Sequence, residues 1–169
     1  MSNMTIQDEE AIKRIEELVV SDRASTAMIC IQGSGEEGPY GELYSCYLKD
    51  AVRFSGVGDM VLKLDEICNW VGAPQRTTDP RFLNIEMERK YREASSEHPE
   101  VNRDNLVYNV NEIPFEGALK AREVLVVYVK YRQYSSMQGS IRGRLTKGEV
   151  VSFRSGMELM RMMRMIGIE

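Results

Sequence analysis

Basic and aromatic side chains collect in one stretch of the sequence that alternates like a β-hairpin. Two alternating runs, residues 124–134 and 138–146, flank Ser135-Ser136-Met137. Successive side chains of a strand point to opposite faces, and guanidinium, ammonium and aromatic groups on one face can bind phosphates and stack on bases. One face of this hairpin is therefore the candidate ligand-binding site, and it carries Tyr128, Lys130, Arg132, Tyr134, Gln138, Arg142 and Arg144.

The pairing expected across this hairpin sets like charges opposite each other. If Tyr134 faces Gln138, then Lys130 faces Arg142. Opposed like charges destabilise a sheet unless an anion offsets them, which favours a site for an anion or a single-stranded nucleic acid. The alternative is a solvated face, or one neutralised by the acidic half of the chain, and the net charge of −4 favours it. The other face of the hairpin is expected to face the core, and it carries Val127, Val129, Tyr131, Ile141 and Leu145.

The remaining motifs do not indicate catalysis. Gly33-Ser34-Gly35-Glu36-Glu37-Gly38 has the spacing of a dinucleotide-binding loop, but it leads into another strand and its glutamates repel phosphate, so we expect a hairpin connection. The one histidine, His98, precedes a proline in a polar stretch. Cys30, Cys46 and Cys68 match no disulfide framework or zinc site and are expected to be small buried apolar residues. We therefore expect no catalytic residue, no metal and no cofactor.

Charge is distributed unevenly along the 169 residues. Residues 1–72 hold 6 Lys and Arg against 13 Asp and Glu, residues 73–121 hold 7 against 9, and residues 122–169 hold 9 against 4. Such asymmetry is typical of complementary parts that attract each other, within a molecule or between subunits, or of a basic face for an anionic partner. No apolar run has the length of a membrane helix, and the acidic N-terminus is unlike a secretion signal. We therefore expect a cytoplasmic protein without contact to a membrane.

Hydrophobic periodicity predicts the elements that position these residues. An amphipathic helix is expected at residues 8–19, and short apolar runs predict strands at 27–32, 42–48 and 51–54. From Val57 the apolar residues recur every three or four positions, which predicts a core-facing helix that ends near Gly72. Its opposite, polar side carries Asp59, Lys63, Glu66 and Asn69.

The last third of the chain repeats this order. Strands are predicted at residues 124–134, 138–146 and 149–153, and Ser155 and Glu158 have the spacing of a capping box before a helix at 155–166. That helix carries five methionines, for which core packing is favoured and a partner groove or dimer seam is the alternative. They are Met157, Met160, Met162, Met163 and Met165.

The two halves of the chain align with each other. When Phe54 is matched to Phe153, the two core helices stay in register without a gap, and Gly41 corresponds to Gly139 after a one-residue shift. Chance similarity between amphipathic helices is the alternative. We interpret the pattern as an α+β fold of two duplicated strand-strand-strand-helix units with antiparallel sheets and core-facing helices. The domain boundaries expected are 1–72 for the N-terminal helix and first unit, 73–121 for a connecting region, and 122–169 for the second unit.

The connecting region is harder to interpret. Helix formers at residues 85–94 predict a polar helix, and Asp79 followed by Pro80 has the chemistry of an N-cap and a first-turn proline. Residues 95–105 are expected to form a loop, and residues 106–110 an edge strand or no strand.

Two segments of the second unit resemble short uncharacterised bacterial proteins. Tyr131-Arg132-Gln133-Tyr134-Ser135-Ser136-Met137-Gln138-Gly139-Ser140-Ile141 is similar to their R-Q-N-x-S-W-Q-G hairpin, and Phe153-Arg154-Ser155-Gly156-Met157-Glu158-Leu159 is similar to their closing F-R-S-x-x-E-L helix. The resemblance covers about the last quarter of the chain, and Tyr134 and Met137 stand where the pattern has Asn and Trp. It implies strand–turn–strand–helix geometry and no particular chemistry.

The sequence as a whole favours a non-enzymatic binding or regulatory module of the bacterial cytoplasm. We expect a homo-oligomer, with a further protein partner as an option. Binding of an anion or a single-stranded nucleic acid through the basic hairpin face is the second hypothesis, and an enzyme is disfavoured because no nucleophile motif is present.

Overall fold

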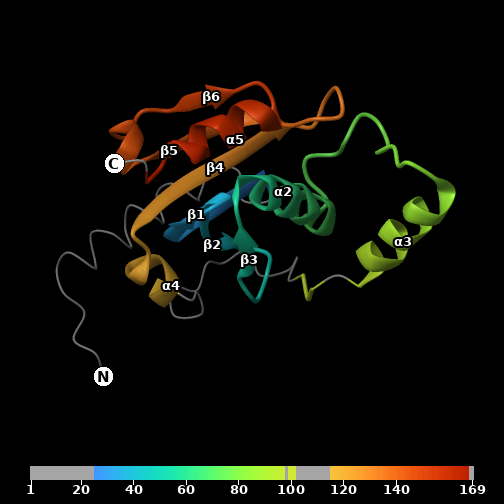
Figure 1. The fold of residues 1–169 in the computed structure, drawn as a ribbon, viewed down its shortest axis with the longest axis horizontal. Coiled ribbons are helices and arrows are strands. Elements are labelled where there is room, and N and C mark those ends of the chain that lie inside the picture. The colour runs from blue at the N-terminus through green and yellow to red at the C-terminus, as the bar shows by residue number, and fades with distance from the viewer. Residues whose placement is uncertain (1–24, 98, 102–114, 168–169) are drawn as a thin grey trace.

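The computed structural model describes residues 25–97, 99–101 and 115–167, which form a six-stranded antiparallel sheet with helices on both faces (Figure 1). The strands lie in the order β3-β2-β1-β4-β5-β6. Their bounds are β1 Thr26–Gly35, β2 Gly38–Ser45, β3 Val52–Ser55, β4 Glu123–Tyr131, β5 Gln138–Gly143 and β6 Val151–Phe153. The helix expected at residues 8–19, the segment 106–110 and His98 lie outside the described residues. The expectation of an α+β fold is confirmed.

Two helices cover one face of the sheet and enclose the main core. They are α2 (Val57–Val71) and α5 (Gly156–Arg164), as the periodicity predicts (Figure 1). Their apolar sides pack on the inward residues of the central strands, and the core includes Ile29, Leu43, Leu64, Val127, Val129, Ile141, Phe153, Leu159 and Met163. On the opposite face Ala118 of the short helix α4 (Phe115–Lys120) packs against Met28 and Cys30 of β1.

The sheet is symmetric in its order about the central β1–β4 pair. Each of these strands pairs with the next strand of its own half and carries an irregularity of register, between Ile31 and Gly33 in β1 and between Val129 and Tyr131 in β4. The two halves also share a second feature. A glycine of β2 lies opposite a phenylalanine of β3, and a glycine of β5 lies opposite a phenylalanine of β6. The internal duplication itself stays a prediction.

Equivalent hydrogen bonds start the two core helices. Asp59 accepts from the backbone N–H of Ser55 at 3.0 Å, and Glu158 accepts from that of Arg154 at 3.1 Å. Ser155 caps α5 as expected, because its Oγ accepts from the N–H of Glu158 at 3.1 Å. Acidic side chains are favourable at these positions because exposed N–H groups and the helix dipole concentrate positive charge there.

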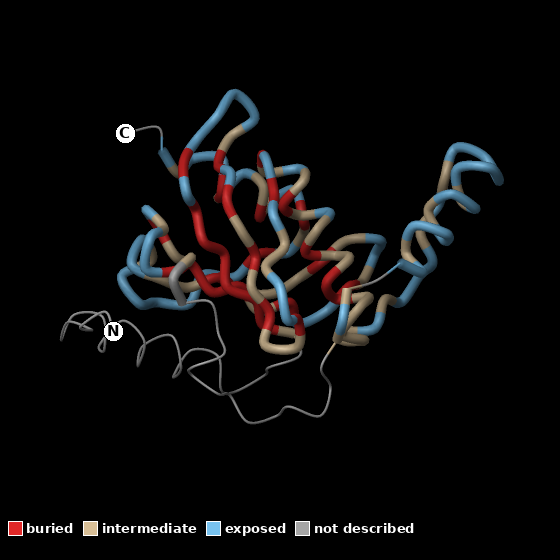
Figure 2. The backbone as a smooth tube through the Cα atoms, turned by 90° about the horizontal axis from the view of Figure 1, so that it is seen from below, coloured by how far each residue is buried: buried red, intermediate tan, exposed pale blue. Residues whose placement is uncertain are grey.

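Helix α3 (Ile85–Ser96) projects from the body of the protein as an arm (Figures 1 and 2). It has no buried residue, which agrees with the polar helix predicted here. The prediction of Asp79 as its N-cap is wrong: the helix starts after Asn84, whose side chain accepts from the N–H of Met87 at 2.9 Å. The ring centroids of Phe82 and Tyr91 lie 4.8 Å apart. This contact packs the segment that precedes α3 against the helix.

The glycine-rich segment near the N-terminus is a hairpin connection, as the sequence predicts. Gly35 pairs with Gly38, and a turn at Glu36 and Glu37 joins β1 to β2. No helix in the described ranges has the length and apolar character needed to cross a bilayer.

Candidate ligand-binding site

The register of the second hairpin differs from the predicted one by four residues in its regular part. Tyr128 lies opposite Ser140, and Arg142 lies opposite Val126. The opposition of Lys130 and Arg142 is therefore wrong. The assignment of the faces is right for the regular part of the hairpin, because Val127, Val129 and Ile141 enter the core and Tyr128 and Arg142 lie on the other face.

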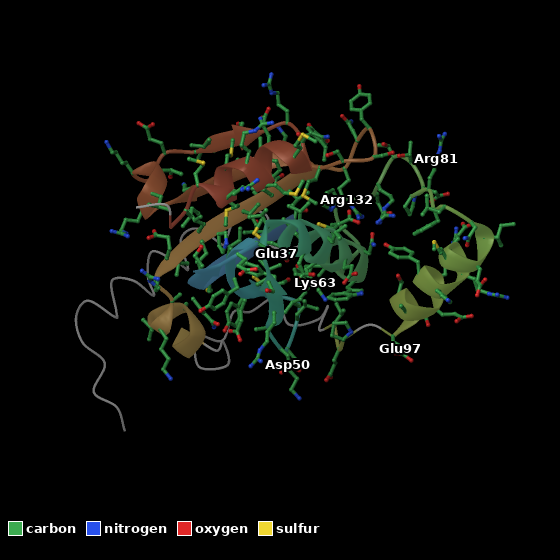
Figure 3. The ribbon with its side chains drawn as sticks, in the orientation of Figure 1. Glu37, Asp50, Lys63, Arg81, Glu97 and Arg132 are labelled. Atoms are coloured by element: carbon green, nitrogen blue, oxygen red, sulfur yellow. The ribbon has the colours of Figure 1, made fainter. Side chains whose placement is uncertain are left out.

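The irregularity in β4 moves Arg132 away from this face. Lys130 has no partner in the register, so one extra residue separates Val129 from Tyr131 and the alternation of side chains is reset. Arg132 is 4% exposed and contacts α2 on the helix-covered side of the sheet, as Figure 3 shows. The prediction that Arg132 and Arg142 share one ligand face is wrong for this reason.

The other predicted residues are spread over the hairpin. Tyr134 is 88% exposed at the turn, and Gln138 bridges the hairpin by bonding the backbone N–H and C=O of Gln133 at 3.0 Å each. The Nζ of Lys130 lies 5.3 Å from the ring centroid of Tyr131. Arg144 lies past the end of β5 in the single turn η2 (Arg144–Thr146) and forms a 2.6 Å ion pair with Glu123. The structure thus brings only Tyr128 and Arg142 together as neighbours on one regular face.

Arg132 belongs instead to a cluster of polar groups on α2. Its Nη1 donates to Asp65 Oδ1 at 3.1 Å and to Asn69 Oδ1 at 2.6 Å, and its Nε donates to the carbonyl of Pro74 at 2.8 Å. Arg76 donates from Nη2 to Asp65 Oδ2 at 2.9 Å and to Asn69 Oδ1 at 3.0 Å. We call these four side chains, Asp65, Asn69, Arg76 and Arg132, the arginine cluster.

The backbone holds the two arginines side by side. Arg76 and Arg132 form an isolated parallel bridge, and the N–H of Thr77 donates to the carbonyl of Arg132 at 3.2 Å. The hydroxyls of Thr78 and Ser135 lie 3.1 Å apart. The segment after α2 is therefore fixed to the second hairpin, and the cluster joins the two halves of the protein.

An apolar cavity opens next to this cluster, between α2, α5 and the turn of the second hairpin. Its volume is about 370 Å³, which is within the range of small ligand sites. Leu62 and Met157 on its rim are 66% and 64% exposed. We call this cavity the groove; apolar side chains line one part, Val61, Leu62, Met137, Met157 and Met160, and polar groups line the other, Asp65, Arg76, Thr78, Arg132, Ser135 and Ser136.

A second cavity of about 490 Å³ lies on the other side of the arginines, between α2 and the arm. Tyr91 and Arg92 line it from the arm, Phe82 from the segment before the arm, and Asn69 and Cys68 from α2. Arg76 and Arg132 line both cavities. The two cavities therefore share one pair of cations at their boundary.

The two buried thiols, Cys68 at the second cavity and Cys30 on the opposite face of the sheet, are poor nucleophiles. Burial raises the pKa of Cys68 to about 12, and the nearby Asp65 carboxylate raises it further against the opposing effect of Arg132. Burial likewise raises the pKa of Cys30 to about 12, with a smaller contribution from Glu42. Both thiols are therefore protonated at neutral pH. Since the thiolate is the reactive form, they react slowly. The three cysteines are free, and Cys30 and Cys68 are buried as expected while Cys46 is half-buried.

Sequence reasoning missed the partners of Arg132. Asn69 was expected on the solvent side of α2, but it lies under the two guanidinium groups because the second hairpin covers that part of the helix. The signal available was the spacing of Asp65 and Asn69, four residues apart on one helix face, where two acceptors can meet one cation. The methionines of α5 do not all pack in the core, which is the role that the sequence favours for them. Met163 is a core residue, whereas Met157 and Met160 line the groove.

Comparisons of the chain with protein-family models, with curated proteins and with solved structures find no match. The fold and the site therefore define the class: an α+β protein whose single sheet supports an open apolar groove beside paired arginines.

Proposed function

We propose that this protein is a non-enzymatic binding module that holds an apolar peptide segment of a protein partner in the groove between α2 and α5. The observation that carries the proposal is the exposure of Leu62 and Met157, 66% and 64%, on the rim of a preformed apolar cavity. Exposed apolar side chains around a cavity are typical of a site that a partner covers.

The chemistry of the wall supports a peptide over a rigid small molecule. Three methionines, Met137, Met157 and Met160, line the groove. Methionine is flexible and polarisable, so it suits surfaces that adapt to side chains of different shape. Small-molecule sites bury about 70–90% of their ligand, whereas the rim residues here stand open to solvent.

The nucleic-acid hypothesis has less support. Arg132 is engaged by α2, and Arg142 no longer faces another cation, so the repulsion that motivated an anionic ligand on that face is absent from the described hairpin. We also propose a cytoplasmic location, for which the lack of a described membrane-spanning helix is a compatible finding.

Selection from a library of random heptapeptides displayed on phage tests the proposal. We expect enrichment of apolar peptides, and we expect the synthetic forms to bind a Leu62→Gln/Met157→Gln double variant at least tenfold more weakly. Leu145→Gln/Met165→Gln is the matched control, because these residues are 49% and 62% exposed and lie outside the groove. Equal binding to wild type and the groove variant, or no enrichment, would refute the proposal.

A further inference from the structure

Arg76 and Arg132, at the end of the groove, have N–H donors that make no hydrogen bond to the described residues. A guanidinium has five N–H donors, and those of Arg132 on Nε and Nη1 are used within the protein. Nη2 of Arg132 makes no hydrogen bond to any described residue. No buried side-chain nitrogen or oxygen among the described residues lacks a partner, so this Nη2 keeps some contact with solvent, and Arg132 lines both cavities.

Arg76 has free donors of the same kind. Its Nη2 bonds Asp65 and Asn69, while its Nε and Nη1 make no hydrogen bond within the described ranges. Its side chain is 20% exposed. A cation that is this shielded interacts more strongly with an anion than one in bulk water.

Charge at the groove is unbalanced. Its charged lining residues are Asp65, Arg76 and Arg132, so two cations face one carboxylate. Both oxygens of that carboxylate are already engaged, Oδ1 by Arg132 and Oδ2 by Arg76. The second cavity adds one residue of each sign, Asp79 and Arg92, and leaves this excess unchanged. One further carboxylate would therefore neutralise the site.

We infer that the peptide bound in the groove carries an acidic side chain, which docks on the free donors of Arg76 and Arg132 while its apolar neighbour packs among Leu62, Met157 and Met160. This inference rests on the proposed function and names the ligand class for the same site. Arginine and carboxylate bind in a planar, paired geometry that gives specificity as well as affinity. The groove thus recognises two features of the peptide together, an apolar side chain and a carboxylate beside it.

The test uses the tightest-binding heptapeptide from the selection described above, made in three forms. The first keeps its acidic residue, the second replaces Asp by Asn or Glu by Gln, and the third replaces it by Lys. Binding is measured by fluorescence anisotropy on the full-length wild-type protein, on Arg76→Gln and on Arg81→Gln. Arg81 is the matched control, because it is an exposed arginine of the same connection that lines neither cavity.

We expect the amide form to bind about tenfold more weakly than the acidic form, and the lysine form more weakly still. The difference between acid and amide should shrink to about twofold in Arg76→Gln and persist in Arg81→Gln. If the acid and amide forms bind the wild type equally, or if the selected groove binders contain no acidic residue, the inference is overturned while the proposed function stands. A failed selection overturns both. The comparison of peptides on the wild type needs no variant, so it decides the question even if Arg76→Gln folds poorly.

Discussion

Gly139 in β5 lies directly opposite Phe153 in β6. The first half of the sheet contains the same relationship, with Gly41 in β2 opposite Phe54 in β3. At both glycines an added Cβ would overlap a backbone carbonyl oxygen of the neighbouring strand, that of Tyr128 for Gly139 and that of Cys30 for Gly41. The backbone thus requires a residue without a side chain at the two positions.

Gly139→Ala and Gly41→Ala should each lower the free energy of unfolding by about 2–3 kcal/mol, because the strands must move apart to admit a methyl group. Urea unfolding followed by circular dichroism measures the change. Gly58→Ala is the control: no atom lies within 4 Å of its added Cβ, and in a helix alanine is favoured over glycine, so this variant should be unchanged or slightly more stable. A neutral result at both strand glycines would contradict the packing described here.

The two arginines that sequence alternation places on one face should differ in their effect on stability. Arg132 is 4% exposed and bonded to Asp65, Asn69 and Pro74, whereas Arg142 is half-buried on the opposite face. Arg132→Met should cost about 3 kcal/mol, because it leaves these acceptors with one cation fewer.

Arg142→Met is the matched control and should change the free energy of unfolding by less than about 0.5 kcal/mol. Thermal unfolding of both variants at the same pH gives the comparison. Similar losses in the two variants would mean that the hairpin faces are assigned incorrectly.

The sequence predicts the faces of the second hairpin better than its register. Alternation of apolar residues places Val127, Val129 and Ile141 in the core, since only one face can be buried against the helices. The register depends on the turn and on one extra residue at Lys130, and the pattern of apolar residues in the sequence reveals neither of them. Tyr134 and Ser135 adopt positive φ angles of 56° and 55°. Glycine or asparagine usually occupies such turn positions, so tyrosine and serine give no sequence signal for this turn. Arg132 was therefore assigned to the wrong face.

The arginine cluster shows a second limit of sequence reasoning. Arg132 and Asn69 are separated by 63 positions in the chain. Periodicity identifies Asn69 as polar and hence as a solvent-facing helix residue, but it holds no information on which later segment covers that part of the helix. Local patterns thus predict elements and their apolar sides, whereas the polar contacts that form a site depend on tertiary packing.

Stability should fall in alkaline solution because of the two buried thiols. An unfolded thiol has a pKa of about 8.5, whereas those of Cys30 and Cys68 are raised to about 12 by burial. Above pH 8.5 the unfolded chain releases these protons first, so unfolding is favoured increasingly until the pH reaches the folded pKa values.

The contribution of Cys68 is isolated by comparing the wild type with Cys68→Ala. Between pH 8 and pH 10 the wild type should lose about 1–2 kcal/mol more of its free energy of unfolding than the variant does, because other alkaline titrations are common to both. Urea unfolding at the two pH values provides the numbers. Parallel losses would show that Cys68 titrates normally in the folded protein.

Self-association through the arm is the last prediction. Leu83, just before the N-cap of α3, is 91% exposed, and Ile85 and Met87 in the first turn of α3 are 83% and 47% exposed. Apolar side chains of this size on a projecting helix without buried residues favour an interface with a second copy, as expected for a homo-oligomer. Sedimentation velocity should show a mass about twice the 19.3 kDa of one chain at micromolar concentration, and Leu83→Ser/Ile85→Ser should restore the monomer. Leu145→Ser/Val150→Ser, at 49% and 59% exposure outside the arm, should leave the dimer intact. A wild-type monomer at every accessible concentration would exclude this interface, because a second copy would then have no measurable affinity for the arm.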